Sequence, residues 1–160
     1  TLGETREPDD LVRRLKEGNT KVIDAGVCAY QEAGAPRSRY FLNVAEVGSG
    51  GAVVDRVNRT TKVLGGKTSF LIAILRTLPR YRNTPIAFEA DGGPRKEAVV
   101  NDLVIANGRF FGGGLQPAPH AQLDDGLFDV VGIGDIDFKT TRKNLGLLRE
   151  GKHLDLPYIS

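Results

Sequence analysis

The stretch VIANGRFFGGGLQPAPHAQLDDGLFDVV, residues 104–131, carries more information about fold and function than the rest of the chain. It begins with an apolar segment and an Asn-Gly turn and continues through an aromatic pair, three glycines and a Pro-rich loop. It ends with two aspartates, a glycine and a second apolar segment. Glycine adopts backbone angles that are closed to other residues and lets other groups approach closely. The pattern predicts two strands joined by a long, ordered loop that serves a function.

On both sides of this stretch, apolar residues at a period of two predict strands and those at helical spacing predict helices. The expected strands are 21–30, 39–47, 84–90, 96–106 and 127–133, and the expected helices are 7–17, 52–62, 68–78 and 137–150.

Turn and cap residues separate these elements. Residues 32–36 and 91–94 have the composition of hairpin turns, and Asp137 and Gly151 suit the two ends of the last helix. Strands outnumber helices, and few strands are joined through helical crossovers. We therefore expect an antiparallel, sheet-dominated α+β domain, a β-sandwich rather than a doubly wound sheet.

The overall composition is that of one soluble domain covering residues 1–160, with 40% hydrophobic and 26% charged residues. No apolar run approaches the roughly 18 residues that a membrane span requires, and the N-terminus lacks a signal-peptide pattern. The net charge of +2 is small and the basic residues are dispersed, so there is no electrostatic case for nucleic acid. Methionine is absent, even at position 1, and we expect the chain to be a segment of a longer protein.

Few side chains are candidates for nucleophilic or acid–base chemistry. Cys28 is the single cysteine, lies in an apolar run and is far in sequence from both histidines, His120 and His153. It is expected to be a small buried hydrophobe in a protein of a reducing compartment. His120 has no second ligand-type residue at metal spacing, so we expect a surface or packing residue. Phe110 and Phe111 are expected in the core, with a lipid-facing position as the alternative.

The glycines of residues 48–51 lie between an expected strand and an expected helix. Neither the spacing of a Rossmann fingerprint nor that of a Walker A loop is present. We expect a plain strand-to-helix turn, with phosphate binding at the helix N-terminus as the alternative.

The sequence Asp124-Asp125-Gly126 allows two interpretations. It can be a turn that enters a strand and nothing more. It can also be a divalent-cation site in which Asp125 supplies a carboxylate while loop carbonyls and waters fill the other positions. An EF-hand is excluded, because the glutamate at the twelfth position of the loop and the flanking helices are missing.

Several short motifs, in this order and at this spacing, resemble the signature of diacylglycerol kinase-like lipid kinases. They are Ala106-Asn107-Gly108, Phe111-Gly112-Gly113-Gly114, residues 117–121 and residues 125–130. Upstream, Ile23-Asp24, residues 41–48 and residues 65–80 are similar to successive elements of the same family, and residues 151–153 to the end of its last helix. The resemblance covers nearly the whole chain.

The resemblance implies that this chain is the β-rich C-terminal domain of a two-domain kinase. In such kinases an N-terminal α/β domain carries a Gly-Gly-Asp-Gly-Thr nucleotide loop, which this chain lacks. The Asp-Gly-Glu segment thought to supply the general base follows the last helix and is also missing here. We therefore expect no catalytic residue in this chain and no activity of the chain alone. Substrate-cleft positions are expected at Asn107, Gly112, Gly113 and Gly114.

The resemblance also implies a structural magnesium ion at the Asp-Gly turn. Its ligands would be the Asp125 side chain and the main-chain oxygens of Gln122 and Leu127. Such an ion would stiffen the loop that holds the three glycines, whereas the magnesium ion that accompanies ATP would be a separate one.

The expected function is that of an ATP-dependent lipid kinase that phosphorylates a lipid hydroxyl, on diacylglycerol, a sphingoid base or another lipid. The parent protein would be cytoplasmic, would contact a membrane surface transiently and could form a homodimer. Two alternatives stay open. One is a kinase of the same superfamily with a soluble substrate such as a dinucleotide, and the other is a non-catalytic β-rich module that binds a ligand or metal.

Overall fold

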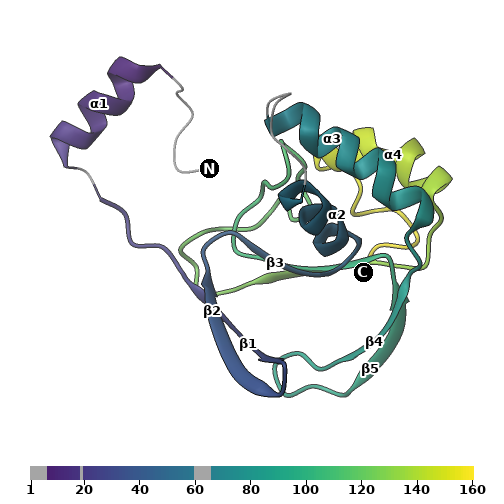
Figure 1. Ribbon diagram of the computed structural model, residues 1–160. Coiled ribbons are helices and arrows are strands. Elements are labelled where there is room, and N and C mark those ends of the chain that lie inside the picture. The colour runs from purple at the N-terminus through teal and green to yellow at the C-terminus, as the bar shows by residue number, and fades with distance from the viewer. Residues whose placement is uncertain (1–6, 19, 60–65) are drawn as a thin grey trace.

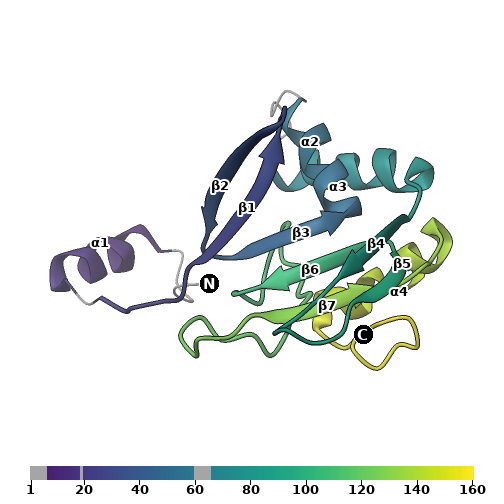
Figure 2. The same ribbon diagram turned by 90° about the horizontal axis from the view of Figure 1, so that it is seen from below.

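A three-stranded antiparallel sheet forms the centre of the computed structural model (Figure 2). Its strands are β3 (Val44–Gly48), β6 (Asp102–Ala106) and β7 (Asp129–Ile133), and β6 lies in the middle. The structure describes residues 7–18, 20–59 and 66–160, and for residues 66–71 it describes the backbone only.

Strand β6 is the most buried strand of the sheet because it has a neighbour on each side and layers on both faces. Val104 is paired with Glu46 on β3 and with Val131 on β7, and it is 1% exposed. Full burial of such a side chain stabilises the fold by about 1.5–3 kcal/mol. The residues buried with it come from β6, β7 and the Pro-rich loop: Ala106, Ala118, Ala121 and Val131.

Three helices lie on one face of this sheet (Figure 1). They are α2 (Ser49–Asn58), α3 (Gly66–Thr77) and α4 (Phe138–Glu150), and a short 3-10 turn, η2 (Leu78–Arg80), follows α3. A second apolar cluster joins α2 to α3 through Val53, Ala73 and Ile74.

Two β-hairpins extend on the opposite side of the sheet (Figure 1). One is formed by β1 (Gly26–Glu32) and β2 (Ala35–Phe41), and the other by β4 (Thr84–Phe88) and β5 (Lys96–Val100). Both turns place two residues in succession at positive φ, 51° and 80° at Ala33-Gly34 and 51° and 69° at Asp91-Gly92. Such turns match the twist of the strands they connect. The two predicted hairpin turns are confirmed.

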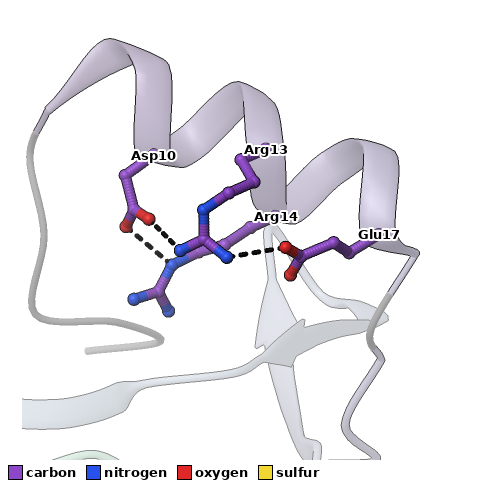
Figure 3. A network of polar contacts seen from close by, with 4 residues as sticks. All are labelled: Asp10, Arg13, Arg14 and Glu17. Atoms are coloured by element: carbon purple, nitrogen blue, oxygen red, sulfur yellow. Dashed lines mark hydrogen bonds and ion pairs between the residues drawn. The ribbon is translucent and has the colours of Figure 1, made fainter.

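Helix α1 (Pro8–Glu17) lies apart from the body of the domain (Figure 1). Its exposed side carries a network in which Arg13 contacts both Asp10 and Glu17, at 2.6 Å from the latter, while Arg14 Nε is 2.9 Å from Asp10 Oδ2 (Figure 3). These i,i+3 and i,i+4 pairs support the helix locally. The hydrogen bonds from Arg13 and Arg14 lower the pKa of the Asp10 carboxyl group.

The predicted α+β class is confirmed: every strand pair in the described part of the chain is antiparallel. The predicted ends of the last helix are confirmed as well. Asp137 Oδ1 accepts a hydrogen bond of 2.8 Å from the Thr140 N–H, and Gly151 ends α4 at a φ of 67°. These features depend on neighbouring residues only, which is why the sequence reveals them.

The prediction of single strands at 39–47 and 96–106 is wrong. The first is divided at Leu42 and Asn43 and the second at Asn101, so that each half pairs in a different sheet. At the second break the Asn101 N–H donates to the carbonyls of Ile133 and Gly134, at 2.8 and 3.2 Å, instead of continuing the hairpin. A β-prone pattern continues through both breaks, and the change of partner strand is a long-range effect.

Smaller differences concern where elements begin and end. The expected strand 21–30 is ordered as β1 only from Gly26, and β7 begins at Asp129. Helix α2 begins three residues before the predicted start, at Ser49. The predicted C-terminal end of that helix, at Lys62, lies outside the described residues.

The prediction that Cys28 is buried is wrong. Its thiol lies on β1, where Gly26 is the only buried residue, and Cys28 itself is exposed. The apolar run that suggested burial belongs to a hairpin that extends from the domain, with Cys28 paired with Arg39 on β2.

Candidate functional site

Asn107 lies at the centre of a hydrogen-bond network just after the end of β6. Its side-chain Nδ2 donates to the carbonyl oxygens of Asp24 at 2.9 Å and Leu42 at 3.0 Å. The main-chain N–H groups of Asn107 and Gly108 both donate to the carbonyl of Asn43. Asn107 thus ties the start of β1, the β2–β3 connection and the end of β6 together. With an exposed fraction of 0%, this predicted cleft residue lies inside the fold.

The three consecutive glycines form a closed loop. Phe111 and Leu115 form an isolated β-bridge across the loop, with N–H···O distances of 3.0 Å in both directions. Between them Gly112, Gly113 and Gly114 have φ angles of 52°, 87° and 104°. Three successive residues in this region are compatible with glycine and strained for other residues. Gly113 and Gly114 are exposed and have open space around them, so their role is to allow the backbone to turn.

Phe111 and Leu115 line an apolar cavity of about 70 Å³ between the sheet and the helices. Other walls come from α2, α3, β6 and α4, through Val53, Ile74, Val104, Leu145 and Leu148. A second cavity of about 50 Å³ shares Asn101, Ile133, Thr141, Leu145 and Leu148 with the first. The two cavities therefore adjoin beneath α4. Phe110 and Phe111, both expected in the core, are half-buried.

The aspartate turn is attached to the N-terminal part of the domain. Asp24 Oδ2 accepts a 2.8 Å hydrogen bond from the Gly126 N–H, and the Asp24 N–H donates to the Leu123 carbonyl at 2.7 Å. Lys21 forms an ion pair with Asp124 at 2.9 Å. Sequence reasoning did not connect Asp24 with this turn, because about 100 residues separate them.

The three residues predicted to bind magnesium, Gln122, Asp125 and Leu127, lie together on this turn and are exposed. Asp125 Oδ1 accepts a 3.0 Å hydrogen bond from the Leu127 N–H, which fixes the carboxylate over the turn. Within the described residues, no three acidic, histidine or cysteine side chains cluster as a metal site. The predicted set depends on one carboxylate and two main-chain oxygens, the hard oxygen donors that magnesium prefers.

A pair of carboxylates that sequence reasoning missed lies where the sheet meets α2. Asp102 Oδ2 accepts hydrogen bonds from the Gly50 N–H at 2.9 Å and from the Ser49 hydroxyl at 3.3 Å. Asp102 Oδ1 and Glu46 Oε2 are buried and have no hydrogen-bond partner. An acidic residue inside an apolar strand pattern, as in VAEVG and NDLVIA, is the sequence signal that could have identified the pair.

Burial raises the pKa of both carboxyl groups. The pKa of Glu46 rises to about 7, because of its burial first and of the neighbouring Asp102 charge second. The pKa of Asp102 rises to about 6 through burial, against the opposing effect of the hydrogen bonds from Gly50, Ser49 and Leu103.

His153 is buried beside the second cavity, whereas His120 is exposed. His153 Nε2 is 3.0 Å from the Pro117 carbonyl oxygen, which can only accept, so Nε2 carries the proton. Its burial lowers the pKa of the imidazole, against the effect of that hydrogen bond, which raises it. His153 therefore attaches the segment after α4 to the Pro-rich loop.

Residues 43–160 match the family model described as the YegS C-terminal NAD kinase β-sandwich-like domain. The chain is 32% identical over 160 residues to a diacylglycerol kinase of Mycobacterium tuberculosis. The match covers 98% of this chain and 49% of that protein. It is 26% identical over 153 residues to a diacylglycerol kinase of Staphylococcus carnosus, and the match covers 95% of this chain and 48% of that protein. The chain thus spans about half the length of these relatives.

Among solved structures, a protein from Bacillus anthracis assigned as a diacylglycerol kinase matches with a TM-score of 0.57. It is 20% identical in sequence, and the match covers 86% of this chain and 43% of that one. At this identity the similarity concerns the fold, and it agrees with the antiparallel α+β arrangement described above.

Proposed function

Because the chain belongs to the family of YegS C-terminal NAD kinase β-sandwich-like domains, we propose that it forms the lipid-acceptor half of an ATP-dependent lipid kinase. The names of its relatives, diacylglycerol kinase and YegS-like lipid kinase, support the kinase class. The structural observation that carries the proposal is the apolar cavity beneath α4, which is lined in part by Phe111 and Leu115 of the glycine loop. An apolar cavity of about 70 Å³ suits a short hydrocarbon segment of an amphiphile rather than a whole acyl chain.

Phosphoryl transfer depends on positioning the acceptor hydroxyl, on neutralising charge with a metal ion and on a group that accepts the hydroxyl proton. In this proposal the present chain contributes the first of these. The cavity takes a short segment of the lipid's hydrocarbon, and the exposed glycines Gly113 and Gly114 leave space for a headgroup at the surface. The residues that bind ATP and its magnesium ion, and the residue that accepts the proton, lie outside positions 1–160.

The proposal predicts a difference between this chain and the complete protein. The protein encoded by the whole reading frame is expected to transfer radioactive phosphate from ATP to diacylglycerol or a sphingoid base in detergent micelles. The 160-residue chain alone is expected to transfer none. Transfer to NAD but to neither lipid would favour a kinase with a soluble substrate, and transfer to no acceptor by the complete protein would favour a binding module. Turnover by the 160-residue chain alone would contradict the proposal that ATP binding and proton acceptance depend on residues outside this chain.

We further propose that the aspartate turn holds a structural magnesium ion through the Asp125 carboxylate and the main-chain oxygens of Gln122 and Leu127. The hydrogen bond from the Leu127 N–H to Asp125 Oδ1 supports this proposal, because it leaves the other carboxylate oxygen for an ion. An ion there would brace the turn that Asp24 and Lys21 attach to the N-terminal part of the domain.

Replacing Asp125 by alanine is expected to abolish the effect of magnesium on stability. The melting temperature of the wild-type chain should be higher in millimolar magnesium chloride than in EDTA, by a few degrees, because an ion that binds only the folded state stabilises it. Asp125→Ala should melt at one temperature in both. Asp124→Ala is the matched control, since it changes the neighbouring carboxylate, and it should keep the magnesium effect. A magnesium effect that survives Asp125→Ala would rule out this ligand.

The proposed reaction takes place at a membrane surface in the cytoplasm, where the lipid substrate lies. No helix in the described part of the chain has the length and apolar character to cross a bilayer. In this proposal, contact with the membrane is peripheral and transient, by this domain or by a homodimer of the whole protein.

A further inference from the structure

Glu46 and Asp102 approach each other on the side of the sheet that faces α2. Gly48 pairs with Asp102 and Glu46 pairs with Val104, so the two acids are diagonal neighbours on adjacent antiparallel strands. Long side chains on such diagonal positions can meet. Two glycines leave room for them: a Cβ at Gly48 would lie 2.8 Å from Asp102 Oδ1, and one at Gly50 would lie 2.1 Å from Glu46 Oε2.

Among the described residues, the surroundings of the pair supply hydrogen bonds for only one of the two carboxylates. Helix α2 contributes the Ser49 hydroxyl and the Gly50 N–H, both to Asp102 Oδ2, and no acidic residue in its first turn. Arg56, at the other end of α2, donates to Thr77 Oγ1 on α3. On β7 the residue opposite Asp102 is the apolar Ile133. Within the described residues, neither Glu46 nor Asp102 forms an ion pair.

One further titratable group is linked to the pair at a distance. Ser49 Oγ also lies 3.0 Å from Asn101 Oδ1, and the Asn101 amide donates to Asn83 Oδ1 at 2.9 Å. Asn83 in turn donates to the carboxylate of Asp135 at 2.6 Å. Asp135 is exposed, so solvent screens its charge and the buried pair itself dominates.

Two buried negative charges side by side need compensation, which either a cation or a proton can supply. Magnesium or calcium takes about six or more oxygen ligands, whereas the pair offers Asp102 Oδ1 and Glu46 Oε2 as its unpartnered buried oxygens. A proton needs one donor and one acceptor, and these two oxygens supply both. The geometry therefore favours a proton.

We propose that Glu46 and Asp102 hold one proton between them and that this proton fastens β3, β6 and the start of α2 together in a pH-dependent way. Glu46 carries the proton and donates it to Asp102 Oδ1, while Asp102 Oδ2 continues to cap α2 through the Gly50 N–H. Deprotonation places two adjacent charges beneath the first turn of α2 and weakens its contact with the sheet. The polar end of the apolar cavity, formed by Ser49, Gly50 and Asp102, changes with it.

The direction of the pH effect is opposite to that of an ordinary carboxylate in an ion pair. The folded state binds the proton more tightly than the unfolded state, in which the two groups titrate near 4.5 and 3.8. The stabilisation is complete below those values. Asp102, with a pKa of about 6, is ionised first and leaves the shared proton on Glu46; the stabilisation by that proton is lost as the pH rises through about 7, the pKa of Glu46 in the folded chain.

The test compares melting temperatures between pH 5 and pH 8 for the wild-type chain and Glu46→Gln. The wild-type melting temperature is expected to fall by at least about 4 °C, given the usual conversion for a domain of this size. The glutamine amide has the shape of a protonated glutamate and donates to Asp102 at every pH. Glu46→Gln should therefore lose most of this slope and melt above the wild type at pH 8. Glu89→Gln, which removes an exposed carboxylate, is the matched control and should keep the wild-type slope.

Carbon-13 NMR of the Glu46 carboxyl group gives a second, direct measurement, with an inflection expected near neutral pH. Parallel melting profiles for the wild type and Glu46→Gln, together with a Glu46 inflection near 4.5, would overturn the proposal. A third arm adds sodium, magnesium or calcium chloride at pH 8 in the Asp125→Ala background. A rise in melting temperature that matches acidification and disappears with Asp102→Asn would assign the site to a cation and likewise overturn the proposal.

Discussion

Asn107→Ala is expected to cost the domain about 2–3 kcal/mol of unfolding free energy, because the fully buried side chain and its two hydrogen bonds are lost together. Two donors to the Asp24 and Leu42 carbonyls disappear, and both acceptors, which are part-buried, lose a partner. Each buried polar group left without its hydrogen bond costs about 1–3 kcal/mol. The small void left by the shortened side chain adds to this. Chemical denaturation followed by circular dichroism would measure the change.

Two companion variants separate the hydrogen bonds from general effects of substitution. Asn107→Asp keeps the shape but removes the donors and adds a buried charge above its pKa, so it should be at least as unstable as the alanine variant at pH 7. Asn58→Ala, at the exposed end of α2, should change stability by less than about 0.5 kcal/mol. Near-wild-type stability of Asn107→Asp would show that the amide hydrogen bonds contribute little.

Gly48→Ala is expected to have the second large effect, a loss of roughly 3–5 kcal/mol, the size associated with overpacking and backbone strain together. An added Cβ would lie 2.5 Å from the Asn101 carbonyl oxygen and 2.7 Å from the Asp102 Cα, and both of these atoms are main chain. The φ of 139° at Gly48 adds strain for any other residue. Relief requires β3 and β6 to separate, which breaks the sheet at its centre.

The neighbouring Gly51→Ala is the matched control for this prediction. Gly48 is the N-cap of α2, and Gly51 lies in the first turn of that helix, at a position where an added Cβ meets nothing within 4 Å. Alanine is a better helix former than glycine, so Gly51→Ala should be neutral or stabilise the domain by up to about 1 kcal/mol. Thermal denaturation of both variants decides the matter, and equal effects at the two positions would contradict the steric argument.

The parts of the fold that neighbouring residues determine could be predicted from the sequence. The two hairpin turns, the Asp137 cap and the end of α4 at Gly151 depend on residues within a few positions, and all are present. The break at Asn101 could not be predicted, because β-prone apolar residues flank it on both sides and only the identity of the partner strand changes.

The candidate site was predictable to the extent that its residues are neighbours in sequence. The positive φ angles of the three glycines and the turn at Asp125 follow from residue type. The partners of Asn107 lie 83 and 65 residues away, and Glu46 and Asp102 are separated by a similar distance along the chain. Their meeting depends on strand register, which no local pattern of this sequence specifies.

The exposed thiol of Cys28 makes this domain convenient for spectroscopy. It is the single cysteine of the chain and lies on β1, in a hairpin that extends away from the sheet. A fluorophore or nitroxide attached by maleimide chemistry would therefore modify one position without disturbing the core, and would report when a vesicle or a second protein approaches that hairpin. The same thiol can link two molecules through a disulfide in air, so a reductant belongs in any measurement of the oligomeric state.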